Sequence, residues 1–308
     1  MEESLPTRRE ALRLLGAAAA VALFESPEGP PVPSMRTRPI PSSGEALPVV
    51  GVGTWQTFDV GSSTADRRPL EEVLTRLVAG GGKVVDSSPM YGRAEGVVGE
   101  IAEKLSLRPS LFLATKVWTT GRENGVEQME RSFRELRTDR IDLMQVHNLV
   151  DVGTHLPTLS DWKARGRIRY AGITHYTASA YPEVERLLRT ERLDFLQINY
   201  SVVEPESGER LLPLAAERGV AVIANRPFGG GDALRRAAGR KLPESAADLG
   251  CRTWAQLLLK WILGNPAVTC AIPGTGKLRH LEDNLQAAVG PLPDARLRRR
   301  MADAVAGF

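Results

Sequence analysis

The chain is organised around residues 83–92, Lys-Val-Val-Asp-Ser-Ser-Pro-Met-Tyr-Gly. Val84 and Val85 are apolar and β-branched, which predicts a short buried strand ending at Asp86. Two serines and a proline then turn the chain, and Tyr91 follows five residues after the aspartate. A phenol has an ordinary pKa of about 10. It becomes a useful proton donor near neutral pH only beside a cation that stabilises the phenolate.

Two later strands also end in polar side chains. Lys116 follows the run Leu111–Thr115, and Asp-Leu-Met-Gln-Val-His-Asn places His147 at the end of another strand. Taken singly, a strand-end aspartate commonly caps a helix and a lone lysine is commonly solvated. An aspartate, a tyrosine, a lysine and a histidine at the ends of successive strands are much harder to obtain by chance. We therefore take these four residues as candidate catalytic groups.

With these residues, the chain resembles the aldo-keto reductase family from about Leu47 to about Ala288. The resemblance implies a catalytic tetrad of Asp86, Tyr91, Lys116 and His147. It also implies hydride transfer from a nicotinamide cofactor to an aldehyde or ketone, which becomes an alcohol. Tyr91 is then the proton donor, Lys116 lowers its pKa and Asp86 holds the lysine. His147 orients the carbonyl oxygen.

The alternation of strand-like and helix-like patterns predicts a parallel sheet. The expected strands are Leu47–Gly51, Val84–Asp86, Leu111–Thr115, Ile141–Val146, Ile168–Ile173, Phe195–Asn199, Val220–Ala224 and Val268–Ile272. The expected helices include Pro69–Ala79, Ala94–Leu105, Gly125–Leu136, Tyr181–Thr190, Arg210–Arg218 and Thr253–Leu263. Eight such units in about 250 residues are typical of a (β/α)8 TIM barrel, whose strands all end on one face. A doubly wound open sheet is the alternative, although no G-x-G-x-x-G opens the first helix.

The resemblance also assigns cofactor and substrate positions. The implied cofactor-binding residues are Gly53, Thr54, Trp55, Asp86, Thr174, His175, Gln197, Asn225, Arg226, Pro227, Phe228, Gly229, Ile272, Gly274, Thr275, Lys277, His280, Asp283 and Asn284. The implied substrate pocket is formed by Trp55, Trp118, His147 and Asn148. Gly229–Gly250, glycine-rich and helix-poor, is either a mobile loop over the cofactor or a disordered insertion.

Three positions depart from the family pattern. Thr174-His175 stands where members commonly have Ser-Asn, and Asn225 stands where an aromatic residue commonly stacks on the nicotinamide. Basic residues that often bind the 2′-phosphate fall on Gly274 and His280. Lys277 and Arg279 still favour NADP(H), while NAD(H) remains an alternative. Asp283 and Asn284 are expected at the adenine.

The first 41 residues are predicted to be a separate leader, followed by the catalytic domain at 42–308. Thr-Arg-Arg-Glu-Ala-Leu-Arg, residues 7–13, resembles a twin-arginine export signal. Leu14–Phe24 is an uncharged segment too short to span a bilayer, and Ala20–Ala22 offers a cleavage site. Ser26–Pro41 is proline-rich and predicts an extended linker. The leader predicts a periplasmic or exported protein that meets the export machinery. The alternative is a frayed helical extension on a cytoplasmic enzyme.

Composition excludes few functional classes. A quarter of the 308 residues are charged, but the formal net charge is only +3, which gives no strong case for nucleic-acid binding. The basic run Arg298–Arg300 is expected to be a solvated tail. Cys251 and Cys270 have no metal-binding spacing and are expected to be free buried thiols, with a disulfide as the alternative. No metal site is predicted, and the expected partner is a small carbonyl compound.

Two other functions fit the same sequence. A nicotinamide-binding regulatory or interaction subunit would share the fold without turnover. An isomerase or lyase on an ordinary barrel would bind no nicotinamide. Because all four tetrad positions are filled, the sequence favours catalysis.

Overall fold

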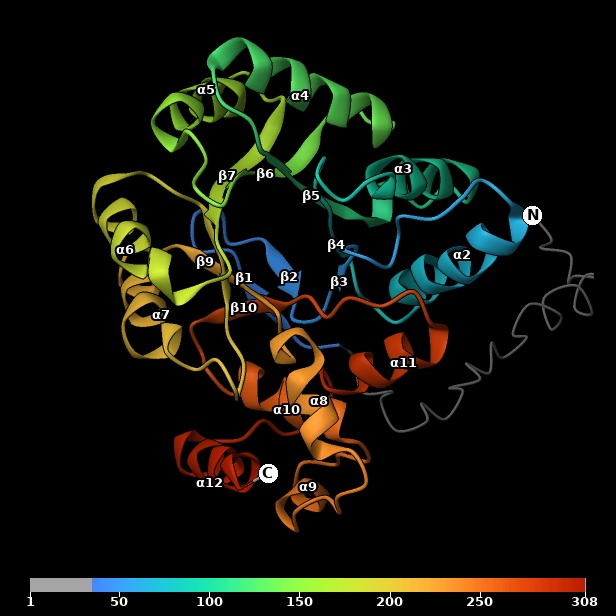
Figure 1. The fold of residues 1–308 in the computed structure, drawn as a ribbon, viewed down its shortest axis with the longest axis vertical. Coiled ribbons are helices and arrows are strands. Elements are labelled where there is room, and N and C mark those ends of the chain that lie inside the picture. The colour runs from blue at the N-terminus through green and yellow to red at the C-terminus, as the bar shows by residue number, and fades with distance from the viewer. Residues whose placement is uncertain (1–34, 308) are drawn as a thin grey trace, which may run out of the picture. The chain divides into compact units, whose positions relative to one another are not determined.

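A computed structural model describes residues 35–307 of the chain. Its centre is a parallel sheet of eight strands that neighbour one another in chain order, β3 to β10, surrounded by helices (Figure 1). Bridges from Val50 to Ala271 and from Gly53 to Gly274 join the last strand to the first. The Gly51 amide donates to the Ala271 carbonyl at 2.9 Å, which closes the ring. The prediction of a (β/α)8 barrel is confirmed.

The elements alternate along the chain as expected. The barrel strands are β3 (Val52–Gly53), β4 (Val84–Asp86), β5 (Phe112–Val117), β6 (Ile141–His147), β7 (Ile168–Thr174), β8 (Phe195–Asn199), β9 (Ala221–Asn225) and β10 (Val268–Ala271). The longer helices are α2 (Thr64–Ala79), α3 (Ala94–Lys104), α4 (Arg122–Glu135), α5 (Val152–Ala164), α6 (Tyr181–Thr190), α7 (Ser207–Glu217), α10 (Trp254–Leu263), α11 (Leu278–Gln286) and α12 (Ala295–Ala306). Two short helices, α8 (Asp232–Ala237) and α9 (Ser245–Asp248), precede α10.

Each strand is buried on both faces, so its side chains alternate between two cores. Outward residues such as Val85 and Leu113 pack with the helices in the larger core. Inward residues form a second core inside the barrel, which we call the inner core. Its members are Ile40, Leu47, Val84, Phe112, Ala114, Leu143, Tyr170, Phe195, Ala221, Ile223, Cys270 and Ile272. The rings of Phe112, Tyr170 and Phe195 lie 5.5–6.0 Å apart within it.

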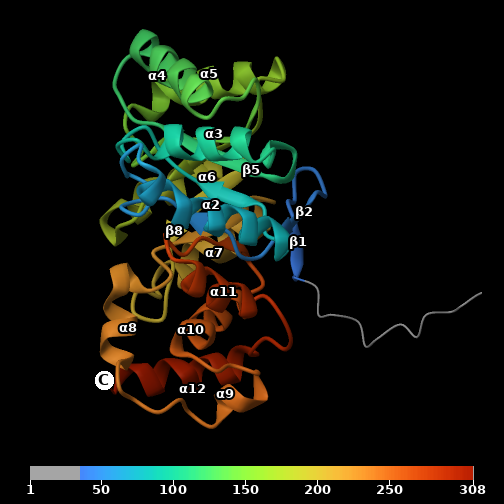
Figure 2. The same cartoon turned by 90° about the vertical axis from the view of Figure 1, so that its right-hand side faces the viewer.

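An antiparallel hairpin of β1 (Thr37–Pro39) and β2 (Ala46–Pro48) closes the amino-terminal end of the barrel (Figure 2). Ile40 and Leu47 from the hairpin complete the inner core. The Arg38 guanidinium donates to the carbonyls of Leu263, Asn265 and Val268, at the end of α10 and the start of β10. Cations are favourable at a helix carboxyl end because they meet unpaired carbonyls there.

The hairpin corrects two sequence expectations. The linker was expected to reach Pro41, but residues 37–39 are already paired in β1. The first strand was expected at Leu47–Gly51, but β2 ends at Pro48 and the barrel strand β3 begins at Val52. The chain therefore divides its apolar run between two sheets. Pro48 helps this division because proline has no N–H to continue a ladder.

Residues 229–250 were predicted to be helix-poor, and that expectation is wrong. The segment opens with a 3₁₀ turn at Gly229–Gly231, whose three φ angles of 57°, 68° and 92° suit glycine. It then forms α8 and α9. Ala233 from α8 packs with Leu258 and Val305, and the ring of Phe228 packs against this cluster. Apolar contacts that the local composition did not reveal stabilise the segment.

The carboxyl-terminal basic run also differs from expectation. Arg298 lies over the Trp261 ring at 4.5 Å and donates to the Trp261 carbonyl at 2.8 Å. It is a packed residue of α12, so the prediction of a solvated tail is wrong for this position. Cys251 and Cys270 are free and buried, as expected.

The predicted leader lies outside the described residues, including the motif at residues 7–13 and the segment at residues 14–24. Within residues 35–307, no helix is both long and apolar enough to cross a bilayer.

Candidate active site

The four predicted catalytic residues meet at the carboxyl-terminal end of the barrel. Asp86 ends β4, Lys116 lies near the end of β5 and His147 ends β6. The Lys116 ammonium donates to Asp86 Oδ2 at 2.7 Å and to the Ser87 carbonyl at 2.6 Å. It lies 5.2 Å from the centre of the Tyr91 ring, which meets the His147 ring edge-on at 5.9 Å. The structure therefore brings all four side chains together.

The site is the last inward-facing layer of the barrel. On β5 the inward residues are Phe112, Ala114 and then Lys116, because every second residue shares a face. The same alternation leads from Leu143 through Gln145 to His147 on β6. Apolar layers thus fill the barrel, and polar side chains cover them at one end.

Two glutamine amides complete the surroundings of Asp86. Gln197 donates to Asp86 Oδ1 at 2.7 Å, and Gln145 donates to the same oxygen at 3.4 Å. Gln145 was not predicted from the sequence, although its position two residues before His147 on one strand was a usable signal. The carboxylate therefore has three donors around it, and Lys116 beside it is fully buried.

The charges of this group shift one another's pKa values. Burial lowers the pKa of Lys116, but the Asp86 carboxylate and the Tyr91 oxygen raise it more, so the net pKa is above its usual value. Burial raises the pKa of the Tyr91 phenol, and Lys116 lowers it only in part. We expected Lys116 to bring the phenol pKa below its usual value. The direction of its effect is correct, but the desolvation of a phenolate outweighs it.

His147 is held as a neutral ring. Its side chain is buried, and its Nδ1 lies 3.0 Å from the Ser88 hydroxyl. Burial lowers the His147 pKa to about 3, with further lowering by Lys116 and His175. A neutral imidazole has one donor and one acceptor nitrogen. His147 can therefore offer an N–H to a ligand without adding charge.

Aromatic side chains are exposed on the loops at the tetrad end of the barrel, a region that we call the mouth. Four large apolar side chains are exposed within residues 35–307, and all lie on loops that follow barrel strands: Trp55, Met90, Trp118 and Tyr176. The Trp118 ring lies 6.4 Å from the His147 ring. The mouth is thus suited to cover an apolar group bound beside His147.

Side chains from two helices hold the Trp118 loop. Gln128 of α4 accepts from the Trp118 amide and donates to its carbonyl. Asp151 accepts from the Gly121 amide at 2.7 Å, and His155 Nε2 lies 2.7 Å from the Thr119 carbonyl. Asn124 of α4 donates to the Thr120 carbonyl at 3.0 Å. Because side chains hold backbone atoms at all four residues 118–121, the Trp118 ring has a defined place.

The β6–α5 loop that carries Asn148 is strained. Asn148, Leu149 and Asp151 have φ angles of 52°, 57° and 48°, a region that non-glycine residues rarely adopt. Asn148 Oδ1 is buried and has no partner within residues 35–307. Such conformations cluster at binding sites. Asn148 directly follows His147, and its place in the substrate pocket stays a prediction.

The predicted nicotinamide residues lie beside the tetrad. Gln197 Oε1 accepts from Thr174 Oγ1 at 3.0 Å, so both ends of the Gln197 amide already have partners. Asn225 Nδ2 donates to the His175 carbonyl at 3.0 Å. Asn225 Oδ1 is buried and unpartnered within the described chain. This orphaned acceptor could accept a hydrogen bond from an N–H of a bound ligand.

Two residues of the loop after β9, Arg226 and Phe228, make different kinds of contact. Arg226 has a φ of 48° and forms an ion pair with Glu204 at 2.7 Å. Pro227 follows it, and Phe228 packs against the cluster around Ala233. The Phe228 ring therefore does not take the place of the missing aromatic residue at Asn225.

The predicted adenosine end lies where β10 leads into α11. The backbones of Gly53 and Gly274 approach closely, and a side chain on Gly274 would meet the Gly53 carbonyl at 3.4 Å. The Ile272 side chain belongs to the inner core, and Thr54 and Asn284 are buried. Thr275 Oγ1 accepts from the Lys277 amide at 3.1 Å at the start of α11.

Cations and carboxylates differ in their partners at this end. Lys277, Arg279 and His280 have no ion-pair partner within residues 35–307, whereas Glu282 is paired with Arg76 at 3.0 Å. Asp283 accepts from Thr253 and Gln256 at 2.8 and 2.6 Å. Burial, and then Arg279 and Lys277, lower the pKa of His280. The two unpaired cations, Lys277 and Arg279, both act on His280 and so lie near one another, which fits a phosphate group.

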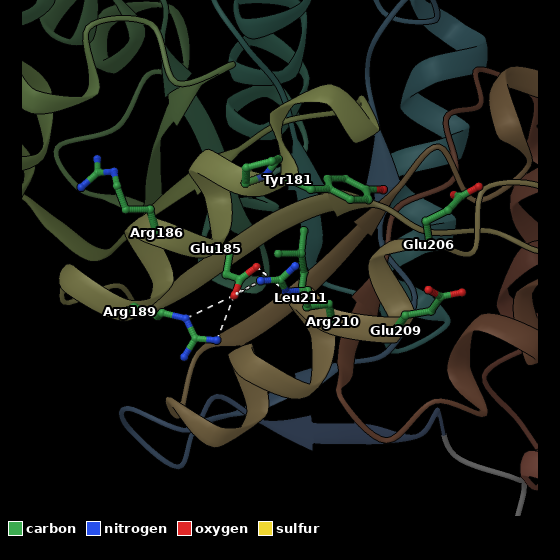
Figure 3. Close-up of a pocket in the computed structure, with 9 residues that line it drawn as sticks. Tyr181, Glu185, Arg186, Arg189, Glu206, Glu209, Arg210 and Leu211 are labelled. Atoms are coloured by element: carbon green, nitrogen blue, oxygen red, sulfur yellow. Dashed lines mark hydrogen bonds and ion pairs between the residues drawn. The ribbon is translucent and has the colours of Figure 1, made fainter.

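Two other concavities lie away from these residues. A groove of about 530 Å³ lies between α6 and α7, where Glu185 is paired with Arg189 and Arg210 (Figure 3). A cleft of about 550 Å³ at the amino-terminal end of the barrel includes Arg108 and Arg169. Neither contains a predicted site residue, and the tetrad remains the candidate site.

Within the described residues, no cluster of three or more acidic, histidine or cysteine side chains could hold a metal ion.

Comparisons with known proteins show what the chain is similar to. The model of the aldo/keto reductase family matches residues 49–301. Methylglyoxal reductase YeaE of Escherichia coli strain K12 is 27% identical over 85% of this chain and 93% of that protein. Aldo-keto reductase str7 of Strobilurus tenacellus is 30% identical over 70% and 75%. An aldo/keto reductase from Klebsiella pneumoniae, solved with NADP and acetate, has a TM-score of 0.71 and 25% identity, covering 85% and 92%.

The charge on Lys116 is expected to control the titration of Tyr91. In Lys116→Met, the phenolate loses a nearby cation, so the Tyr91 pKa rises further above its usual value. The measurement is a ¹³C NMR pH titration of the tyrosine ring carbon bonded to the hydroxyl, assigned with Tyr91→Phe. Lys104→Met, a change at an exposed pair, is the control. A Tyr91 titration that is the same in all three proteins contradicts the assigned contact.

Removal of Lys116 alone also leaves Asp86 as a buried charge without its cation, which costs about 3–5 kcal/mol of unfolding free energy. Asp86→Asn/Lys116→Met removes both charges and is expected to recover most of this loss. The thermal melting of the two variants therefore separates lost stability from the change in the Tyr91 pKa.

Proposed function

The chain belongs to the aldo/keto reductase family, and we propose that it reduces aldehyde or ketone carbonyls to alcohols with NADP(H). The observation that carries this proposal is the meeting of Lys116, Asp86, Tyr91 and His147 at the open end of the barrel. A buried cation beside a phenol, next to a neutral imidazole, can stabilise and protonate a developing alkoxide. The enzyme is thus an NAD(P)H-dependent oxidoreductase.

The protein's own groups act on the substrate oxygen. The bound nicotinamide supplies a hydride to the carbonyl carbon. His147 donates its N–H to the carbonyl oxygen and orients it, and Tyr91 donates the proton that completes the alcohol. Lys116 stabilises the phenolate that remains, while Asp86 holds the ammonium. Donors placed in advance at that oxygen stabilise the transition state because they need no rearrangement during the reaction.

A raised Tyr91 pKa is compatible with this role. The phenol stays protonated at neutral pH and is ready to donate when the oxygen gains charge. In the reverse direction, the phenolate must accept a proton. Since the Tyr91 pKa is raised, alcohol oxidation is expected to be favoured only as the pH rises toward that pKa.

A regulatory subunit on the same fold is not favoured, because every catalytic position is filled and assembled. An isomerase or lyase would leave the cation cluster at α11 and the orphaned Asn225 oxygen without a use.

We take NADP(H) as the preferred cofactor because of the partners around α11. The two cofactors differ by a phosphate on the adenosine ribose. The carboxylates that could instead bind a free ribose hydroxyl, Glu282 and Asp283, already have partners. Lys277 and Arg279 do not. The Klebsiella relative with NADP bound supports the same preference.

For the substrate, we propose an aldehyde whose apolar part lies against Trp55 and Trp118. Aromatic rings at the mouth gain from covering apolar surface. Methylglyoxal, named for the Escherichia coli relative, is the natural first member of a test panel.

We also propose that the leader directs export through the twin-arginine route to the periplasm. The proposal rests on residues 7–13 and on the uncharged segment after them. The described chain begins at the hairpin, at the end of the barrel opposite the tetrad. An exported enzyme needs its nicotinamide bound before export or supplied afterwards.

The reductase assignment predicts that Tyr91→Phe lowers carbonyl turnover by about 10²–10⁴-fold, since the ring stays but its proton is lost. NADPH binding, followed by cofactor fluorescence, should be unchanged. Tyr181→Phe, which removes a partly buried hydroxyl bonded to Asn199 in the outer groove, is the control and should retain turnover (Figure 3). Wild-type turnover in Tyr91→Phe rules out Tyr91 as the proton donor.

The cofactor assignment predicts a higher kcat/KM for NADPH than for NADH with one aldehyde. Each of Lys277→Ala and Arg279→Ala should reduce that ratio by up to about fivefold, since an exposed charge contributes about 0–1 kcal/mol. Lys104→Ala, a distant surface change, should not alter it. A wild type that prefers NADH, or variants with an unaltered ratio, would refute the placement of the 2′-phosphate.

The export assignment predicts a processed chain that begins near residue 23 and is recovered outside the cytoplasm. Replacement of Arg8 and Arg9 by Lys should leave the full-length chain inside, since the pair is recognised by a receptor. Arg13→Lys is the matched control. The measurements are N-terminal mass spectrometry and cell fractionation in the native host. A soluble cytoplasmic chain that keeps its original terminus refutes export.

A further inference from the structure

We propose that Ser88 is a positioning residue that holds His147 in the tautomer protonated at Nε2, so that this ring presents an N–H to the substrate oxygen. The proposal deepens the proposed function and rests on it for its catalytic consequence. The hydrogen-bond arrangement around Ser88, however, stands on the structure alone.

The Ser88 hydroxyl has two neighbours with different abilities. It is fully buried, and its Oγ lies 3.0 Å from His147 Nδ1 and 3.4 Å from the Met90 amide nitrogen. The amide can only donate, so the Ser88 oxygen accepts from it. The hydroxyl proton is then available to Nδ1, which accepts it when Nδ1 is the unprotonated nitrogen of the ring. The ring proton is left on Nε2.

The opposite tautomer leaves a polar group without a partner. If Nδ1 carried the proton, it would donate to Ser88 Oγ, which already accepts from Met90. The Ser88 hydroxyl proton would then need another acceptor, and the structure shows none within residues 35–307. A buried donor without a partner is destabilising, because it has lost its hydrogen bonds to water. The environment of Ser88 therefore favours one tautomer.

The loop that carries Ser88 is held on several sides. The Ser87 amide donates to the Ala114 carbonyl at 2.8 Å, and the Ser88 carbonyl accepts from the Tyr91 amide at 2.9 Å. Pro89, between Ser88 and Met90, has no N–H that could compete for the hydroxyl oxygen or the carbonyl oxygen of Ser88. The same short loop thus positions the proton donor Tyr91 and the orienting ring of His147.

The tautomer matters because the ring is neutral. Burial, Lys116 and His175 lower the His147 pKa to about 3, so a second ring proton is absent at neutral pH. With the proton on Nδ1, the ring would present a lone pair to the carbonyl oxygen, and two acceptors would face each other. Control of the tautomer by Ser88 then sets whether His147 helps or hinders the reaction.

The first experiment reads the tautomer directly. ¹⁵N NMR of histidine-labelled protein, with His147 assigned by His147→Gln among the four histidines, distinguishes Nδ1–H from Nε2–H. The proposal expects Nε2–H in the wild type and a shift toward Nδ1–H in Ser88→Ala. Ser87→Ala, which removes an equally buried hydroxyl that does not contact His147, should keep the wild-type signal. A wild-type ring protonated at Nδ1, or an unshifted Ser88→Ala, overturns the proposal.

The second experiment tests the catalytic consequence with a double-mutant cycle. Ser88→Ala should lower kcat by up to about 10²-fold, because loss of one oriented donor at the reacting oxygen typically lowers kcat by about 10²–10³-fold. In the His147→Gln background, the same change should have little further effect, because Ser88 acts through the ring. An equal loss in both backgrounds overturns the proposal. A wild type without any carbonyl turnover instead refutes the proposed function and leaves the tautomer result standing.

Discussion

The buried ion pair between Lys116 and Asp86 is the interaction on which the rest of the site depends. Burying both charges is costly, and the cost is offset only where geometry and further hydrogen bonds are favourable. Here the ammonium contacts both Asp86 and the Ser87 carbonyl, and two glutamine amides reach the other carboxylate oxygen. The pair therefore fixes the relative positions of the ends of β4, β5 and β8. Tyr91 and His147 are placed against that rigid group.

The barrel can hold this buried ion pair because its apolar core and its polar site lie at different ends of the strands. Apolar inward residues fill the end of the barrel next to the hairpin, and polar inward residues such as Lys116, Gln145 and His147 occupy the carboxyl-terminal ends of the strands. The polar layer thus rests on a close-packed support. The hairpin covers the other end of the barrel, and large aromatic side chains are exposed on the loops at the end that holds the tetrad.

The two ends of the predicted cofactor site are organised differently. Beside the tetrad, amide groups form a network in which Asn225 Oδ1 remains unpartnered within the described chain. At α11, cations lie together while the neighbouring carboxylates are held by Arg76, Thr253 and Gln256. Hydrogen bonds would orient the nicotinamide at one end, and charge would discriminate NADP(H) from NAD(H) at the other.

By itself, the sequence determined the barrel and the tetrad. Both follow from local patterns: apolar strands, helix periods and polar residues at strand ends, which a parallel barrel must bring to one face. The alternation along β6 also contained Gln145, which was overlooked. Only the tertiary structure decided the hairpin at residues 37–48, the helices within residues 229–250, the packing of Arg298 and the contact between Ser88 and His147. These depend on partners far away in the chain. The net pKa of Tyr91 belongs with them, because it is set by a balance between burial and the Lys116 charge that no local pattern contains.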